Sequence, residues 1–379
     1  MIFFVAPAED LEGITEYLEQ AGPAVNRRLT TVSYDDLVVR RRLSLGTYIF
    51  AAIDELTPTE RDIASRCCEE LSRTSPDIRL INRPAEVRLR YDLLRTCFEQ
   101  KRNTFRVRRA FEFHRCRRFP VFVRPEHEHL GSLTPMLHSR RQLVRALVNA
   151  AVRGYRLRDL LIIEFCDTAD PAGVYRMYSA VGVGDRIIPK TLLHNRNWVT
   201  KWKGRLLDAD KAREQAEYVE GDLHAAWLRE TFAVAGIGYG RIDYGVKDGV
   251  PQVWEINTNP TLVRRTGALS TMSAEQWTVL APGQEAFLRR FEAAFEAIDT
   301  DMDAGRRSRS TYRRSRSASC TRRSDSNRDC WLEGRRSPGS PGLRGGFSAV
   351  SSPGGGEAHP RTSAPRRRRP PRVTAARSA

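Results

Sequence analysis

Long apolar segments are missing from this sequence, and cysteine is scarce. No hydrophobic run reaches the roughly 20 residues that a membrane span needs. The opening MIFFVAPAED is too short and too acidic for a signal peptide. The seven cysteines are odd in number and form no CxxC pair, which is typical of a reducing compartment rather than of a disulfide framework. These absences predict a cytoplasmic protein without a membrane partner.

Lysine is also scarce: the chain has six Lys and 57 Arg. The net charge of +17 is unevenly distributed. Residues 301–379 contain 19 Arg, no Lys and six acidic residues, a net charge of +13. Residues 1–300 carry 44 basic and 40 acidic side chains, a net charge of only +4. Composition therefore gives no reason to expect nucleic acid as a partner, except through the basic end of the chain.

That end, residues 301–379, is rich in Arg, Ser, Pro and Gly and poor in aliphatic residues. Such a segment cannot bury a core, so it is predicted to be a disordered tail. Attraction to nucleic acid or a membrane is physically possible for it. A solvated tail, or the out-of-frame end of a GC-rich gene, is the interpretation that we favour.

The remaining residues predict an α/β protein, and they allow two or three compact units. Strands at 1–5 and 47–53 alternate with helices at 10–20 and 58–73, which indicates a small α/β domain over residues 1–85. Residues 86–300 form the second predicted unit. Its expected elements are helices at 86–101, 140–154, 208–234 and 285–298, strands at 104–107, 119–124 and 159–165, and hairpins at 175–190 and 240–257; a strand at 79–82 precedes this unit.

The most informative stretch is GRIDYGVKDGVPQVWEINTNPTL, residues 240–262. It predicts two strands around an Asp-Gly turn. If the loop is three residues long, Asp243 lies opposite Glu255 and Arg241 opposite Asn257, all on one face. Trp254 and Ile256 would then lie on the other face.

Two carboxylates about 5 Å apart across a strand pair repel each other unless a cation lies between them. Oxygen ligands from Asp, Glu and Asn suit a hard ion such as magnesium, completed by phosphate oxygens. The plain alternative is a polar hairpin with one solvated face.

The pattern Arg241-x-Asp243, a short hairpin, then Glu255-Ile-Asn257-Thr-x-Pro resembles the metal-binding end of the ATP-grasp superfamily, which includes D-alanine–D-alanine ligase and the ribosomal-protein glutamate ligase. The resemblance implies an ATP-grasp fold and a magnesium–ATP site, with two Mg²⁺ ions expected and Mn²⁺ as a substitute. Asp243, Glu255 and Asn257 would hold the metal. Arg241 would be catalytic and would face the transferred phosphate.

Other positions follow from the same resemblance. Arg124, at the end of the strand 119–124, stands where relatives commonly carry a lysine that reaches ATP phosphates. The loop 126–134 would cap phosphates. The predicted nucleotide contacts are Arg124, His129, Gly131, Ser132, Glu164, Phe165 and Trp254.

Alternatives remain at several of these positions. His127 and His129 suggest a metal pair, although a solvated or phosphate-facing pair is favoured. Glu164 also fits the end of an ordinary core strand. Arg176 is a second catalytic candidate, near substrate or the γ-phosphate, and surface charge explains it almost as well. The segment 198–203 could face substrate, pack, or bind an anion weakly.

The implied activity is that of an ATP- and magnesium-dependent ligase. It would join a small-molecule or peptide carboxylate to an amine, or less often a thiol, through an acyl phosphate. The protein would position the reacting groups rather than supply a nucleophile. Two alternatives remain: a kinase-like phosphotransferase, and a non-catalytic ATP-binding partner protein, which Arg124 and the single glycine of the loop favour. The sequence does not identify the substrates or the oligomeric state.

Overall fold

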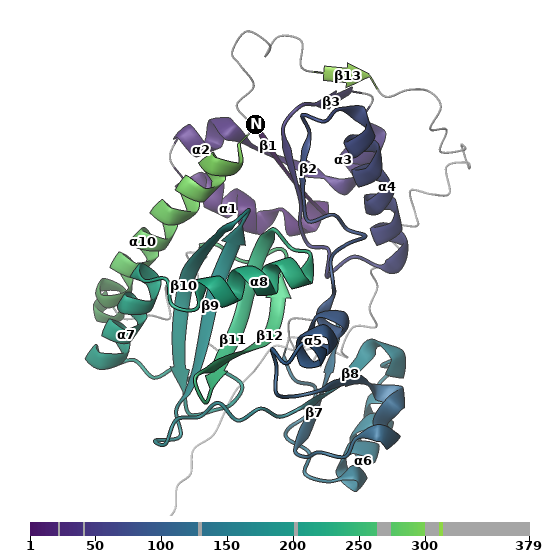
Figure 1. Cartoon of the computed structure of the whole chain (residues 1–379), viewed down its shortest axis with the longest axis vertical. Helices are drawn as coiled ribbons and strands as arrows, with labels where there is room; N and C mark the ends of the chain where they lie inside the picture. Colours follow the sequence, from purple (N-terminus) through teal and green to yellow (C-terminus); the bar gives the residue numbers. More distant parts are fainter. Residues whose placement is uncertain are drawn as a thin grey trace, which may run out of the picture. The chain divides into compact units, whose positions relative to one another are not determined.

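A computed structural model describes residues 1–21, 23–40, 42–127, 131–200, 204–263, 274–299 and 311–313. All of them belong to one unit of the chain, Met1–Arg335. The elements confirm a mixed α/β protein that contains both parallel and antiparallel sheets (Figure 1).

The N-terminal sheet is parallel, with the strand order β2-β1-β4-β5. Its core strands are nearly all apolar, which is typical of a sheet covered on both faces. Helix α4 begins with a capping box, in which Thr57 and Glu60 each accept from the other's backbone N–H, and with Pro58 at its first turn. The elements are β1 (Ile2–Ala6), η1 (Ala8–Asp10), α1 (Glu12–Gln20), α2 (Pro23–Arg28), β2 (Leu29–Ser33), α3 (Tyr34–Val39), β3 (Arg42–Ser44), β4 (Thr47–Phe50), α4 (Pro58–Thr74) and β5 (Arg79–Ile81).

A small antiparallel sheet, β6-β8-β7, follows helix α5. In β7, Val121 and Val123 are buried beneath α6, whereas Phe122 and Arg124 alternate with them on the opposite face. The elements are α5 (Arg90–Glu99), β6 (Val107–Arg109), η2 (Ala110–Arg115), β7 (Val121–Pro125), α6 (Arg140–Val152), η3 (Leu157–Asp159) and β8 (Leu160–Glu164).

The larger antiparallel sheet has the order β10-β9-β11-β12. Tyr178 and Tyr244 stack at 5.2 Å on the face that α7 and α8 cover, and Figure 1 shows α8 across that face. On the other face, Tyr239 contacts Phe4 of the N-terminal sheet and Phe295 of α10. The elements are β9 (Tyr175–Val183), β10 (Arg186–Asn195), α7 (Ala209–Glu220), α8 (Ala225–Ala235), β11 (Tyr239–Lys247), β12 (Val250–Asn257) and α10 (Ala274–Ile298).

The single helix predicted over residues 208–234 is wrong, because α7 and α8 are separate. Gly221 ends α7 in an extended conformation, and His224 before α8 has a φ of 62°. The helical hydrophobic pattern continues through this break, which is why periodicity alone did not reveal it.

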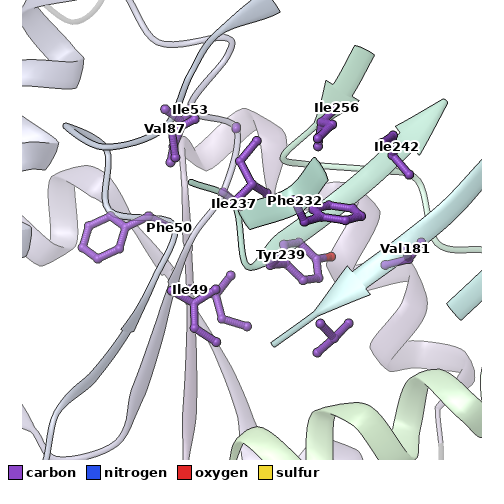
Figure 2. Packing of buried hydrophobic residues seen from close by; sticks show 14 of the residues in the cluster. Ile49, Phe50, Ile53, Val87, Val181, Phe232, Ile237, Tyr239, Ile242 and Ile256 are labelled. Atoms are coloured by element: carbon purple, nitrogen blue, oxygen red, sulfur yellow. The ribbon is translucent and has the colours of Figure 1, made fainter. Parts of the chain in front are cut away.

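One core joins the N-terminal sheet to the larger sheet. Figure 2 shows Ile49 of β4 in the same core as Ile237 and Tyr239. Tyr239 is the first residue of β11, and Ile237 comes just before it. Asn82 ties the two sheets by hydrogen bonds: its amide donates to Phe50 O (3.0 Å) and Tyr239 O (2.7 Å), and its Oδ1 accepts from Tyr239 N (3.0 Å). The N-terminal sheet therefore fixes the start of the strand that carries the predicted site.

Within residues 301–379 the structure describes only β13 (Thr311–Arg313), which pairs antiparallel with β3. The rest of the predicted tail lies outside the described residues. In the described part of the chain, every helix is too short or too polar to cross a bilayer.

Candidate active site

The hairpin β11–β12 has the predicted pairing. Asp243 lies opposite Glu255, and Arg241 lies opposite Asn257. The reason differs from the prediction, because the turn is the two residues Asp248-Gly249 and a bulge shifts the register between Asp243 and Tyr244. The extra residue on β12 restores the pairing that a three-residue loop would have given.

Trp254 is the residue that the bulge reorients. A Cβ placed on Gly245 would lie 2.6 Å from Trp254 Cζ2, so the indole covers Gly245. Gly245 shares the face of Asp243, because both residues lie two apart on β11. The predicted placement of Trp254 with Ile256 on the opposite face is therefore wrong. The bulge adds the indole to the wall of the polar face, and its predicted nucleotide contact remains a proposal.

Arg241 and Asp243 form a bidentate ion pair, with Nε–Oδ1 and Nη2–Oδ2 distances of 2.9 Å. The Asp243 side chain is only 8% exposed. Burial raises the pKa of Asp243, and so does the neighbouring charge of Glu255, against the opposing effect of Arg241. The pKa of Arg241 is raised as well: burial lowers it, but the charges of Asp243 and Glu255 outweigh that effect.

Glu255 is held by two arginines from distant parts of the sequence. Its Oε2 lies 2.5 Å from Arg90 Nη2 and 3.1 Å from Arg124 Nη2. The exposed fractions of these side chains are 16% for Glu255, 6% for Arg90 and 11% for Arg124. Burial lowers the pKa of Arg124, and the charge of Glu255 opposes that change. Arg124, predicted as a phosphate contact, thus lies at the same face as the predicted metal ligands.

Arg90 was not among the predicted site residues. It begins α5 close to Arg83, Arg88 and Arg95 in the sequence, and no local pattern distinguishes it from these arginines. Its guanidinium also donates to the carbonyl oxygen of Glu126. The Glu126 side chain accepts from Tyr91 N at 3.3 Å and pairs with Arg109. This buried network fixes the direction in which Arg90 points, so that its other nitrogen reaches Glu255.

The residues that follow β12 are hydrogen-bonded to the loop after β4 of the N-terminal sheet. Asn257 Oδ1 accepts from Asn259 N at 2.6 Å. Thr258 accepts from Ile53 N at 2.9 Å and donates to the carboxylate of Asp54. The side chains of the polar face are therefore built on backbone that is restrained at both ends. Lys190 of β10 adds another cation near this face, since its charge lowers the pKa of Asp243.

The donor set fits magnesium that arrives together with a polyphosphate. Asp243, Glu255 and Asn257 supply carboxylate and amide oxygens, which magnesium prefers. Three guanidiniums, those of Arg90, Arg124 and Arg241, contact these carboxylates and outnumber them. Over the described residues, His, Cys, Asp and Glu form no cluster of three or more that could hold a metal. A bare cation would meet a surplus of positive charge, whereas a metal–nucleotide complex brings compensating negative charge.

Phe165, a predicted nucleotide contact, lies beside other aromatic rings. The rings of Phe122 and Phe165 lie 4.9 and 5.8 Å from Trp198. Of the three roles open for the segment 198–203, the structure shows packing at Trp198, whose ring contacts both phenylalanines. Residues 201–203 lie outside the described residues. Glu164 accepts from Arg106 N at 3.1 Å and lies 3.7 Å from Arg118, so in this structure its carboxylate is engaged within the small sheet.

The predicted phosphate loop is described in part. Ser132 Oγ donates to Val123 O at 3.3 Å, which places it beside β7. Gly131 has a φ of 96°, a conformation that favours glycine. His129 lies outside the described residues. The phosphate contacts predicted for these residues remain proposals.

Arg176 is not brought to this site. It lies on the face of β9 that carries Tyr178, the face covered by helices, whereas Asp243 pairs with Ser179 on the opposite face. Its guanidinium contacts Glu214 at 2.7 Å and Asp170 at 2.6 Å. These hydrogen bonds raise its pKa. The predicted position of Arg176 near the γ-phosphate is therefore not supported, because alternation along β9 points it to the other side of the sheet.

No family model matches this sequence, and no curated protein matches it. Solved structures with a similar arrangement include D-alanine–D-alanine ligase from Bacillus anthracis complexed with ATP (11% identity, 77% of this chain, 99% of that chain, TM-score 0.41). Others are D-cycloserine synthetase DcsG (17% identity, 76% and 99%, TM-score 0.39) and an ATP-grasp RimK domain protein from Sphaerobacter thermophilus (14% identity, 75% and 97%, TM-score 0.41). The chain is similar to these proteins in the arrangement of its elements. At these TM-scores the likeness assigns no activity and no residue role.

Proposed function

We propose that this protein is an ATP- and magnesium-dependent ligase of the ATP-grasp type, joining a carboxylate to an amine or a thiol. The proposal is carried by one observation, the pair Asp243 and Glu255 facing each other beneath the guanidiniums of Arg90, Arg124 and Arg241. A purely structural polar hairpin does not require cations from three separate elements. A phosphate chain with its metal does require such an arrangement.

Each residue then has a defined task. Asp243, Glu255 and Asn257 would hold magnesium, which when bound neutralises charge on the phosphates. Arg241 stays beside Asp243 and faces the phosphate that is transferred. Arg124 offers a planar fork that binds phosphate oxygens in two places, unlike the point charge of a lysine.

Arg90 and Arg124 also have a task toward Glu255. Their guanidiniums balance the buried charge of this carboxylate. A carboxylate so enclosed would be costly to leave alone. The same guanidiniums would bind the oxygens of a phosphate chain, and Glu255 would then hold the metal. Metal affinity should therefore depend strongly on nucleotide.

The reaction consists of two substitutions. The substrate carboxylate attacks the γ-phosphorus of ATP, the bond to the β-phosphate oxygen breaks, and ADP leaves. The amine then attacks the acyl carbon, phosphate leaves with the electron pair of the broken C–O bond, and the amine loses a proton to solvent or phosphate. The fixed cations stabilise charge at both stages, and no protein nucleophile is needed.

Thermal unfolding tests the binding half of this proposal. Mg–ATP at about 100 times its Kd should stabilise the parent by about 2.7 kcal/mol, and MgCl₂ alone should leave the melting temperature nearly unchanged. Asp243→Asn should lose most of the nucleotide-dependent gain. Equal gains in parent and mutant would contradict the metal assignment.

Hydroxylamine tests the chemical half, because it traps acyl phosphates as hydroxamates. A panel of amino acids and short peptides as carboxylates should give ADP and hydroxamate for at least one member, with none formed without ATP. A phosphorylated product that resists hydroxylamine would instead indicate a kinase-like enzyme. ATP binding without ADP formation over the whole panel would indicate a non-catalytic ATP-binding protein.

A further inference from the structure

Helix α6 presents a row of valines to solvent. Val144, Val148 and Val152 are 37%, 56% and 83% exposed. They are three of nine large apolar side chains that are exposed among the described residues, and all three belong to one helix of 13 residues. Single exposed apolar residues need no explanation, but an ordered row of them does.

The row is separate from the face that packs. At about 100° per residue, the three valines fall within about 80° of the helix circumference. Leu143 and Leu147 lie on another side of the helix and are buried in the core of the small sheet. No described residue that packs into that core comes from the valine row. The valines therefore contribute nothing to the packing of this sheet.

The segment that carries the row is rich in positive charge. Residues 107–164 contain 12 Arg, no Lys and five acidic residues, a net charge of +7, whereas the other residues up to 300 carry 32 basic and 35 acidic side chains, a net charge of −3. Helix α6 itself has three Arg and no acidic residue. Two of them, Arg141 and Arg145, project among the valines. No ion pair joins either arginine to another residue in the described ranges.

We infer that this face of α6, formed by Arg141, Val144, Arg145, Val148 and Val152, docks an acidic amphipathic helical segment of a protein or peptide partner. The valines match an apolar stripe at helical spacing, and the arginines match acidic residues beside that stripe. The tail of the chain is not the occupant, because residues 301–379 carry +13. The inference does not depend on the proposed ligase activity.

Two other anionic partners fit less well. A lipid surface favours Trp, Phe or Leu on the inserted face of a helix that is free to enter it, whereas this row holds only valine and α6 is packed on its other side. Nucleic acid would use the arginines and leave the valine row without a matching surface. An acidic helix uses both features. The small area predicts weak, transient binding.

The test is fluorescence anisotropy with the full chain and a labelled 18-residue peptide that carries Leu at positions i, i+3, i+4 and i+7 of each repeat and Glu elsewhere. A scrambled peptide of the same composition is the charge control. The parent should bind the ordered peptide at least about tenfold more tightly than the scrambled one. Val148→Ser combined with Val152→Ser should remove that preference, and Arg141→Glu combined with Arg145→Glu should weaken binding of both peptides.

Val39→Ser is the matched control, because Val39 of α3 is 73% exposed and far in sequence from α6. It should leave the preference intact. All variants should keep the parental melting temperature within about 2 °C, since they alter exposed side chains. Equal affinity for ordered and scrambled peptides, or a preference that survives the valine double mutant, overturns the inference. So does tighter binding of phosphatidylserine vesicles or duplex DNA that the valine double mutant abolishes.

Discussion

Two arginine–carboxylate networks lie on opposite faces of the same antiparallel sheet, and they differ in how they are built. Arg176, Asp170 and Glu214 come from β9 and segments near it, with His194 beside Glu214 at 2.9 Å. The side chains of Asp170, Arg176 and Glu214 are 26–36% exposed. This network joins neighbouring elements, and each of its carboxylates contacts Arg176.

The network around Glu255 instead draws Arg90 from α5 and Arg124 from β7, across sequence separations of 165 and 131 residues. Its members are more deeply buried. The pKa of Asp243 is raised by burial, whereas that of Asp170 is lowered by its hydrogen bond to Arg176. A local ion pair stabilises the fold modestly at most. Burying charged side chains from three elements on one face costs free energy, because each charge loses its hydration. Such an arrangement is typical of a site that binds a charged ligand.

The largest expected effect concerns Glu255→Gln. The mutation keeps the size of the side chain and removes the charge that two arginines and the proposed metal share. ATP turnover should fall by about 10²–10³-fold. Glu214→Gln, on the other network, is the matched control and should stay within about twofold of the parent. Both rates are measured as ADP release at equal magnesium concentration. A Glu255→Gln protein with the parental rate would refute the two-carboxylate site.

The network around Arg176 should also make the stability of the protein depend on pH. Hydrogen bonds to Arg176 lower the pKa of Asp170 below its ordinary 3.8, and that of Glu214 is lowered below 4.5 by Arg176 and His194 against the effect of burial. A lowered pKa gives stability that is present above the unfolded-state value and is lost as pH falls through the folded-state value.

Arg176→Gln should therefore lower the melting temperature slightly at pH 7, and the difference from the parent should shrink as the pH falls below the ordinary pKa values of 4.5 and 3.8. Mg–ATP stabilisation at pH 7 should be parental, because Arg176 lies on the other face. Thermal scans from pH 7 to pH 3, with and without Mg–ATP, provide the measurement. A difference between parent and variant that grows on acidification would contradict the role given to this network.

The smallest effect is expected for the tail. Ending the chain after Thr300 removes β13, whose three residues pair with β3, and should cost less than about 1 kcal/mol while Mg–ATP stabilisation persists. Ending it after Glu296 is the contrasting variant. That truncation also removes Asp299, which binds Arg28 at 3.1 Å and the N-terminal amine, and should lower the melting temperature clearly. Loss of nucleotide binding in the chain that ends at Thr300 would make the tail part of the functional unit.

Several features were determined by the sequence alone. Alternation grouped Arg241 with Asp243 on one strand and Glu255 with Asn257 on the next, and the structure keeps both groups; the bulge is what brings the two groups to one face. The α/β character of residues 1–85 followed from apolar strands separated by helices with clear caps, and the structure has strands and helices there. These are local patterns, set by the period of a strand or by the chemistry of a cap, so a short window of sequence contains them.

Tertiary structure decided the rest. The bulge at Trp254 turned that indole to the polar face, because one extra residue in a ladder reverses the side of its neighbour. Sheet pairing decided that Arg176 lies behind the sheet, away from Asp243. Arg90, one of two arginines in α5, became part of the site only because packing brings α5 to β12. Charges that meet across more than a hundred residues leave no periodic trace in the chain, and only the packed fold shows which of them share a site.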